Sequence, residues 1–445
     1  AVAAGSTLLA SCATKSRPRR PGANERLQHA AIGVGGMMGG RDLDQFLSHP
    51  GCQVVALCDV DRRNLDTAAA RVPGARLYAD WRELLEREGS RLDSVSITVP
   101  DHMHAAIALA AMRAGKHVYC QKPLCHDVAE CRTVAETARR SGVVTQLGTQ
   151  FASGIGDRQA VQWLRSGAIG QVSRVILSAN RRGAERYRLA GPRPSVGAPV
   201  PDGLAWDLWL GTAPERPYAP EIYHPSTWRS WQDFGTGWSG DIGCHLFDAV
   251  WKGLELSAPR TVVATVEAGW SKTPARRADT WPQTNHIVWT FPGNERTTSE
   301  LTVEWYDGES FPSDAIQALA RAEGFKTYPG EAAMVIGSEG ALLLPHQSGP
   351  RLLPREKFAG AVRDSFAPRN HYHHFVDGCF GRAAPESPFL QTAPMTEAIL
   401  LGTVAVRVPG TVLQWDAARL RIPNSPAAQR LLRRSYRPGW QPGGV

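Results

Sequence analysis

The chain has 445 residues, 42% of them hydrophobic. That composition is enough for a large buried core, and the length is more natural for two domains than for one. The formal charge is +8, but only seven of the 50 basic residues are lysines, and the arginines are spread along the chain. This spread indicates a compositional bias, so we expect no nucleic-acid partner.

Residues 1–26 precede the first predicted domain and contain an apolar, small-residue stretch that ends in Leu-Ala-Ser-Cys at Cys12. A basic, Pro-rich segment follows directly. The pattern resembles the end of an export signal with a lipoprotein box, in which Cys12 would carry a lipid anchor. We expect an exported protein, periplasmic or anchored to the membrane; the alternative is an ordinary Ala-rich and Ser-rich terminus of a cytoplasmic protein. The eight cysteines show no CxxC pair and are predicted to be buried free thiols.

From residue 27 to residue 148, short apolar runs alternate with amphipathic stretches. The predicted strands are 29–34, 53–58, 94–98, 117–120 and 143–147, and the predicted helices are 41–48, 61–71, 80–86, 102–114 and 127–141. Strands that alternate with helices of this length predict βαβ units and a parallel, doubly wound sheet.

Residues 149–445 follow a different pattern, typical of an α+β domain with a large, mostly antiparallel sheet. The predicted strands are 171–179, 261–268, 286–291, 301–306, 333–336 and 341–344, and the predicted helices are 157–166, 371–380 and 395–406. The last two strands are joined by a Gly-Ser-Glu-Gly turn. A Pro-rich, Gly-rich and Arg-rich segment over 181–203 is predicted to be a binding loop or lid.

The first strand ends in a glycine-rich turn that opens a helix. Such a turn lets the backbone approach a pyrophosphate at the helix N-terminus. The residues predicted to line it are Gly33, Gly35, Gly36 and Met38, with Met38 in place of the glycine of a strict GxGxxG motif. Asp59 ends the second strand at the position where an acid binds the ribose 2′-hydroxyl. The acid favours NAD over NADP, although Arg62 and Arg63 keep NADP as the second choice.

Two further strands end in polar residues, at the edge where doubly wound sheets bind ligands. Pro100 and His104 follow one of these strands, and Gln121 and Lys122 follow the other. Lysine is scarce in this chain, and a proline after Lys122 fixes the local backbone. We therefore predict a functional Lys122, the alternative being a solvated lysine at a strand end.

Asp241 and His245 lie four residues apart in a predicted helix that opens near Gly240. At that spacing they share a helix face, and an acid beside a histidine can orient the imidazole as a general base. From the spacing alone, a capping aspartate and a core histidine explain the pair better.

In order along the chain, the segments GVGG, CDVD, TVPDHMHA, AGKHVYCQKPLCHDVAE, LGTQ, SGAIGQV, WDLWLGTAPERPY, WSGDIGCHLFD and IGSEGALLL stand out. From about residue 28 to the C-terminus, this order resembles the glucose-fructose oxidoreductase and inositol dehydrogenase family (Gfo/Idh/MocA), particularly its exported bacterial members. The resemblance implies a Rossmann domain, a carbohydrate substrate and a homo-oligomer.

The resemblance also assigns residues. It implies a catalytic set of Lys122, Asp241 and His245, in which His245 accepts the hydroxyl proton, Lys122 hydrogen-bonds the same oxygen and Asp241 orients the pair. It extends the cofactor set to Pro100, His104, Gln121, Lys122 and Gln150, and it places Trp228, Arg229 and His245 at the substrate. The family usually has Glu before this lysine, and the Gln121 found here removes a partner that would hold Lys122 charged.

Six tryptophans cluster around the predicted catalytic helix, at positions 206, 209, 228, 231, 238 and 251. Their faces could stack on sugars, but large aromatic residues are also ordinary core residues. The histidines at 371, 373 and 374 suggest a metal site, but adjacent helical residues point apart and no third ligand pattern follows, so we expect none.

The leading hypothesis is an NAD-dependent oxidoreductase that acts on a secondary alcohol of a sugar, cyclitol or glycoside. The alternative is a glycoside hydrolase that uses bound NAD transiently for oxidation, elimination and return of the hydride. A cofactor-binding sensor is the third hypothesis, and the complete set of Lys122, Asp241 and His245 argues against it.

Overall fold

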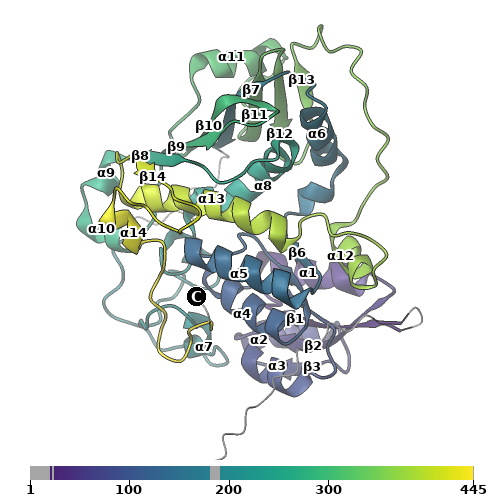
Figure 1. Cartoon of the computed structure of the whole chain (residues 1–445). Coiled ribbons are helices and arrows are strands. Elements are labelled where there is room, and N and C mark those ends of the chain that lie inside the picture. Colours follow the sequence, from purple (N-terminus) through teal and green to yellow (C-terminus); the bar gives the residue numbers. More distant parts are fainter. Residues whose placement is uncertain (1–20, 23–24, 181–190, 444–445) are drawn as a thin grey trace, which may run out of the picture.

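The computed structural model describes residues 21–22, 25–180 and 191–443, which form two sheets with their helices (Figure 1). Cys12 and the first part of the predicted loop over 181–203 lie outside the described residues.

The N-terminal sheet has six parallel strands in the order β3-β2-β1-β4-β5-β6. Its elements are β1 (Leu27–Ile32), α1 (Gly36–Leu47), β2 (Cys52–Cys58), α2 (Arg62–Ala69), β3 (Arg76–Tyr78), α3 (Trp81–Glu88), β4 (Ser94–Ile97), α4 (Asp101–Arg113), β5 (His117–Cys120), α5 (Val128–Ser141) and β6 (Thr145–Leu147). The strand order reverses between β1 and β4, and a ligand crevice is expected at the carboxyl ends of these two strands. The predicted doubly wound sheet is confirmed.

Local sequence explains how several of these helices begin. The side chains of Asp61, Asp80 and Asp127 cap α2, α3 and α5 by accepting backbone hydrogen bonds. At α5 the cap is reciprocal, because the side chain of Glu130 in turn accepts from the Asp127 amide.

The second sheet has eight strands in the order β13-β12-β11-β7-β10-β9-β8-β14 and is antiparallel except where β7 pairs with β10. Its strands are β7 (Val172–Ala179), β8 (Thr261–Val266), β9 (Asn285–Pro292), β10 (Thr297–Asp307), β11 (Glu331–Gly337), β12 (Ala341–Pro345), β13 (Arg351–Leu353) and β14 (Leu413–Gln414). The prediction of a mostly antiparallel sheet is confirmed.

Helices of this second part pack on the sheet or return toward the first. They are η1 (Gln150–Ser153), α6 (Ile155–Arg165), α7 (Trp206–Leu210), η3 (Thr227–Ser230), α8 (Gly237–Leu254), α9 (Ala268–Ser271), α10 (Pro274–Asp279), α11 (Asp314–Ala322), α12 (His371–Cys379), α13 (Phe389–Arg407) and α14 (Pro426–Arg430). The predicted catalytic helix, α8, begins about one turn before the expected Gly240.

Helix α13 is long and apolar enough to cross a membrane by length and composition. Within the described residues, however, 83% of its apolar window is buried inside the protein. It lies between the second sheet and the N-terminal domain, in contact with α5, α8 and β8 (Figure 1). The structure therefore uses it as a core helix that joins the two parts.

Two segments far along the chain complete the N-terminal domain. Helix α12 supplies Tyr372, Phe375 and Val376 to the core between α1 and the parallel sheet. A second segment, residues 203–234, forms its own aromatic cluster and is attached beside β2, where the Arg62 amide donates to the Gly203 carbonyl at 2.8 Å. The end of β2 therefore has a wall built from the later part of the sequence.

Candidate functional site

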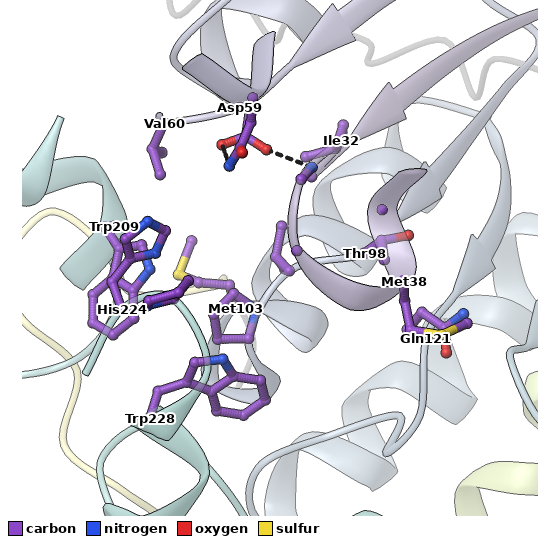
Figure 2. A pocket seen from close by; sticks show the side chains of 18 of the residues that line it. Ile32, Met38, Asp59, Val60, Thr98, Met103, Gln121, Trp209, His224 and Trp228 are labelled. Carbon is purple, nitrogen blue, oxygen red and sulfur yellow. Dashed lines mark hydrogen bonds between the residues drawn. The ribbon is translucent and has the colours of Figure 1, made fainter. Parts of the chain in front are cut away.

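A cavity of about 310 Å³ lies at the carboxyl ends of β1, β2, β4 and β5. One wall is the parallel sheet with its glycine-rich turn, and the other comes from the segment 203–234. Figure 2 shows Asp59 and Thr98 on the first side and Trp209, His224 and Trp228 on the second. The cavity therefore sits at the reversal of strand order, where the sequence predicted a dinucleotide.

Close backbone contacts require glycine at two positions of the glycine-rich turn. Gly33 has φ +82°, and a Cβ atom there would lie 2.2 Å from the Thr98 carbonyl oxygen. A Cβ atom at Gly39 would lie 2.6 Å from the Val34 carbonyl carbon, so this residue allows α1 to pack against the turn. Gly39 thus replaces the third glycine of the GxGxxG motif, which would stand at position 38. Met38 lines the cavity together with Gly33, Gly35 and Gly36.

Asp59 follows β2 directly and lines the cavity. Its Oδ2 accepts hydrogen bonds from the amides of Val34 (2.9 Å) and Gly35 (3.0 Å), so the acid also fixes the glycine-rich turn. Arg62 and Arg63 pair with Asp66 and Asp61 and do not line this cavity. A carboxylate whose neighbouring guanidinium groups are engaged elsewhere favours a ribose 2′-hydroxyl over a 2′-phosphate.

Lys122 reaches the cavity from the end of β5. Its Nζ donates to Asp241 Oδ1 at 2.5 Å and to the Asp241 carbonyl oxygen at 3.0 Å. Arg229 Nε lies 3.5 Å from the other carboxylate oxygen of Asp241. Although burial raises the pKa of Asp241, Lys122 and Arg229 outweigh it and lower that pKa to about 2.

These contacts show which groups surround Lys122 and Asp241. Within the described part of the chain, the Asp241 carboxylate forms its ion pairs with Lys122 and Arg229, not with His245. Gln121 lines the cavity, but its amide Nε2 donates to Asp42. The carboxylate that faces Lys122 therefore comes from α8 and not from position 121.

Asp101, at the start of α4, is a cavity-lining acid that sequence reasoning missed. It is 2% exposed, and its Oδ2 accepts from the amide (3.1 Å) and hydroxyl (2.9 Å) of Thr236, the residue before α8. Burial, reinforced by the charge of Asp241, raises the pKa of Asp101 to about 7. The two acids thus differ strongly in proton affinity, a pattern common in catalytic sites.

His245 lies one turn after Asp241, half-buried, and does not line the cavity described above. Its ring is 6.1 Å from Phe151 and 5.0 Å from His346, centroid to centroid. Burial, with the positive charge of Lys122 adding to it, lowers the pKa of His245 well below its usual value. His346, from the turn after β12, carries no sequence motif that could have revealed it.

Among the other predicted site residues, Pro100, Trp228 and Arg229 line the cavity. The Arg229 guanidinium lies 4.2 Å from the centroid of the Trp228 ring. The structure does not bring His104 or Gln150 to the cavity. Both ring nitrogens of His104 lie within 2.8 Å of backbone carbonyl oxygens, and Gln150 donates to the Tyr372 hydroxyl.

Two of the three histidines considered as a metal site have other partners: His371 lies close to Ser153 and the Leu147 carbonyl, and His373 to Ser48. Over the described ranges, no group of three His, Cys, Asp or Glu side chains could hold a metal ion. The seven cysteines of these ranges are free and buried, as predicted for them.

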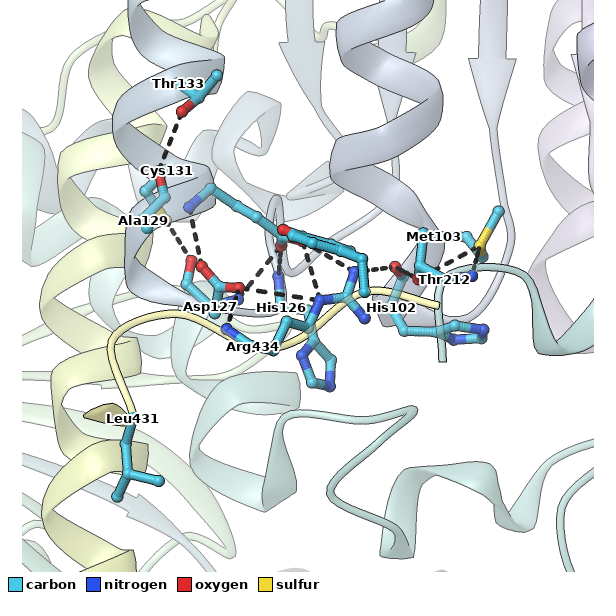
Figure 3. Close-up of polar contacts among 12 residues, drawn as sticks. His102, Met103, His126, Asp127, Ala129, Cys131, Thr133, Thr212, Leu431 and Arg434 are labelled. Atoms are coloured by element: carbon cyan, nitrogen blue, oxygen red, sulfur yellow. Dashed lines mark hydrogen bonds and ion pairs between the residues drawn. The ribbon is translucent and has the colours of Figure 1, made fainter. Parts of the chain in front are cut away.

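A second polar cluster fastens the end of the chain to the N-terminal domain (Figure 3). Arg434 donates to the fully buried Glu130 of α5 at 2.8 Å and to the His102 carbonyl of α4 at 2.5 Å. Tyr436 donates to the same glutamate at 2.8 Å. Because these buried polar groups satisfy one another, they attach the C-terminal segment to α4 and α5, and the cluster is adequately explained by this structural role.

Curated relatives match the N-terminal third of the chain. Inositol 2-dehydrogenase of Salmonella typhimurium is 31% identical over 148 residues, 33% of this chain and 43% of that protein. A glycosyl hydrolase family 109 protein of Shewanella sp. is 29% identical over 150 residues, 32% of each. The chain thus spans less than half the length of these relatives.

Solved structures share the whole fold at low identity. An inositol dehydrogenase homologue from Azotobacter vinelandii, complexed with NADH and myo-inositol, has a TM-score of 0.58 at 17% identity and covers 90% of this chain and 100% of its own. An aldose-aldose oxidoreductase from Caulobacter crescentus, complexed with glycerol, has a TM-score of 0.57 at 18% identity, with 88% and 100% covered.

Two family models cover more than half of the chain. "Oxidoreductase family, NAD-binding Rossmann fold" matches residues 27–149, and "Oxidoreductase family, C-terminal alpha/beta domain" matches residues 157–288. The Gly-rich turn, Asp59 and the wall of the cavity at the strand ends lie within the first match. The wall from residues 203–234 and α8 lie within the second. The chain belongs to the Gfo/Idh/MocA family of oxidoreductases, with an NAD-binding Rossmann domain followed by the family's α/β domain.

Proposed function

We propose that the protein transfers a hydride between a secondary alcohol of a sugar, cyclitol or glycoside and the nicotinamide of NAD. The observation that carries the proposal is the position of Lys122. Its ammonium is held at 2.5 Å by Asp241 and lies in the same cavity as the glycine-rich turn and Asp59. A cation at that position can bind an alcohol oxygen while hydride leaves or returns.

NAD, when bound, supplies the hydride acceptor. The chain supplies the proton chemistry, and we assign the hydroxyl proton to His245. Burial and the charge of Lys122 keep the pKa of His245 low, so its imidazole is neutral and able to accept a proton at pH 7. Its Nδ1 is buried without a hydrogen-bond partner among the described residues.

Lys122 and Asp241 then act as a pair. Asp241 stays ionised because its pKa is lowered to about 2, and it fixes the ammonium group that faces the substrate oxygen. Arg229 shares this carboxylate, and we place Arg229 and Trp228 beside the substrate. The family relatives that act on inositol support the polyol class.

The second candidate is NAD-dependent glycoside hydrolysis, which uses the same residues. The match to a glycosyl hydrolase family 109 protein supports it. In this reaction, oxidation at one carbon would acidify its neighbour, and elimination would break the glycosidic bond. Water would then add to the double bond left by elimination before the hydride returns to the oxidised carbon. The two candidates differ in their products, because only net oxidation accumulates NADH.

The test incubates the purified protein with NAD and a panel of free sugars, cyclitols and aryl glycosides, and follows NADH and released aglycone together. Dehydrogenase activity gives NADH in proportion to product, and hydrolase activity gives aglycone without net NADH. Lys122→Ala and His245→Ala should abolish either activity, because each removes a group at the substrate oxygen. The two variants should still bind NAD. Full turnover in both would remove these residues from the reaction.

We also propose that the protein is exported and carries a lipid on Cys12, and that it forms a homo-oligomer. The Leu-Ala-Ser-Cys sequence supports the anchor. Labelling cells with a radioactive fatty acid should mark the wild-type precursor and not Cys12→Ser.

The proposed homo-oligomer has its own test. Light scattering of the purified protein should give a multiple of 48.4 kDa, the mass of this chain.

A further inference from the structure

Asp42 is a buried carboxylate directly behind the cofactor cavity. It lies on α1 and is 1% exposed. Its Oδ2 accepts from Thr98 Oγ1 (2.8 Å) and Gln121 Nε2 (2.8 Å), and its Oδ1 accepts from the Tyr372 hydroxyl (2.7 Å). A buried carboxylate that binds three donors is well satisfied, so removing it would leave three groups to find other partners.

Two of these donors line the cavity. Thr98 follows β4 and Gln121 follows β5, so the carboxylate joins the ends of two adjacent strands. The third donor, Tyr372, comes from α12 and closes the site from behind. Asp42 is therefore the common acceptor for two cavity side chains and for the helix that covers them.

The hydrogen bond to Asp42 also fixes the orientation of the Gln121 side-chain amide. With Nε2 directed at Asp42, Oε1 faces Gly148, where a Cβ atom would lie 2.6 Å from it. The Gln121 side chain is thus bonded to Asp42 and packed against Gly148. The next residue in the chain is Lys122.

We propose that Asp42 is a positioning residue of the cofactor site, which holds Thr98 and Gln121 at the ends of β4 and β5. Asp42 acts through Gln121 and Thr98, and it needs no contact with NAD. The inference rests on the proposed NAD site but not on the identity of the substrate.

Exchanging the two groups tests this directly. In the double variant Asp42→Asn/Gln121→Glu, the new amide nitrogen on α1 can donate to the new carboxylate after β5 and to Thr98, and the new amide oxygen can still accept from Tyr372. The double variant can therefore form all three hydrogen bonds of the wild type. In the bonds to Thr98 and to residue 121 the donor and the acceptor are exchanged, and the bond from Tyr372 is unchanged. In Gln121→Glu alone, two buried carboxylates face each other across about 3 Å, and one must hold a proton.

The titratable and charged groups around this pair are Arg41 on α1, Tyr119 and Cys120 on β5, and Tyr372 on α12. Burial raises the pKa of Tyr119, Cys120 and Tyr372 above their usual values, so none of the three ionises between about pH 6 and pH 8. Asp101 lines the same cavity and its pKa is raised to about 7, so it titrates in this range in the wild type and in every variant. Only the pH dependence that a variant shows beyond that of the wild type is assigned to the added carboxyl group.

The experiment measures NAD dissociation constants by calorimetry between pH 6 and pH 8 for the wild type, both single variants and the double variant. Asp44→Asn, an exposed acid on the same helix, is the matched control. We expect Gln121→Glu to bind NAD about tenfold more weakly at pH 8 and to recover toward pH 6. The double variant should return to within about threefold of the wild type at each pH and follow the pH dependence of the wild type.

A merely structural role would lower the melting temperature of the variants and leave NAD affinity unchanged, and that result would overturn the inference. A double variant that binds as weakly as Gln121→Glu would also overturn it. A wild-type protein that binds no NAD at any pH would overturn the proposed function and this inference together. NAD binding without turnover of any tested sugar would count only against the proposed substrate class.

Discussion

The raised pKa of Asp101 predicts how its replacement changes stability with pH. Burial and the charge of Asp241 raise this pKa to about 7, compared with the usual value of 3.8. Below pH 7 the folded protein keeps the proton, while the unfolded chain has already lost it above about pH 4. Folding is therefore progressively opposed as the pH rises from about 4 to about 7, and the full cost applies above that range.

Asp101→Asn removes this cost, because the amide has no proton to lose, and it keeps an oxygen that can accept from Thr236. Each pH unit between about 5 and 7 corresponds to about 1.4 kcal/mol, so the advantage of the variant should grow by about 3 kcal/mol between pH 5 and pH 8. The unfolding entropy for 445 residues is about 0.9 kcal/mol/K, which makes this about 3 °C in Tm.

The assay compares Tm for the wild type and Asp101→Asn at pH 5, 6, 7 and 8. The control is Asp66→Asn, whose exposed carboxylate pairs with Arg62 and should give parallel curves. If the Tm difference between Asp101→Asn and the wild type stays constant across this range, Asp101 ionises normally in the folded protein and the reasoning fails.

Three further predictions concern the cavity and the chain end. Gly33→Ala places a Cβ atom against the Thr98 carbonyl at positive φ and should lower the free energy of unfolding in urea by at least about 2 kcal/mol. The same variant should bind NAD more weakly. Asp59→Ala frees the Val34 and Gly35 amides and should weaken NAD binding about tenfold by calorimetry; unchanged affinity would contradict the ribose assignment. Arg434→Ala leaves the buried Glu130 without its cation and should lower the free energy of unfolding by about 3 kcal/mol; a loss below about 1 kcal/mol would show that the pair is dispensable.

The N-terminal sheet could be predicted because its strands and helices alternate with clear apolar patterns. Strand β3 could not, because it has only three residues, whereas the equally short β6 lies in the longer run 143–147 from which a strand was predicted. The second sheet could be predicted strand by strand except for β13 and β14, which have three and two residues. Pattern length, more than pattern strength, limits what the sequence alone predicts of this fold.

The candidate site could be predicted where a residue follows a strand or a glycine-rich turn, as Asp59 and Lys122 do. Contacts between distant segments could not be read from the sequence. Spacing on one helix placed Asp241 with His245, whereas in the structure a lysine 119 residues away occupies its carboxylate. Asp101 follows a strand in the sequence, but no spacing or motif distinguishes it from its neighbours. Its contact with Thr236, 135 residues away, is visible only in the structure.

The attachment of Arg434 and Tyr436 to α5 has a consequence for synthesis of the protein. A nascent chain that has left the ribosome only as far as β10 contains every strand of the parallel sheet but lacks α12 and the Arg434 and Tyr436 donors that satisfy Glu130. The nucleotide-binding domain is therefore synthesised first, but its packing is complete only after α12 and the C-terminal segment have been synthesised. Truncation near the C-terminus should therefore damage the N-terminal half as much as the part from which residues were removed.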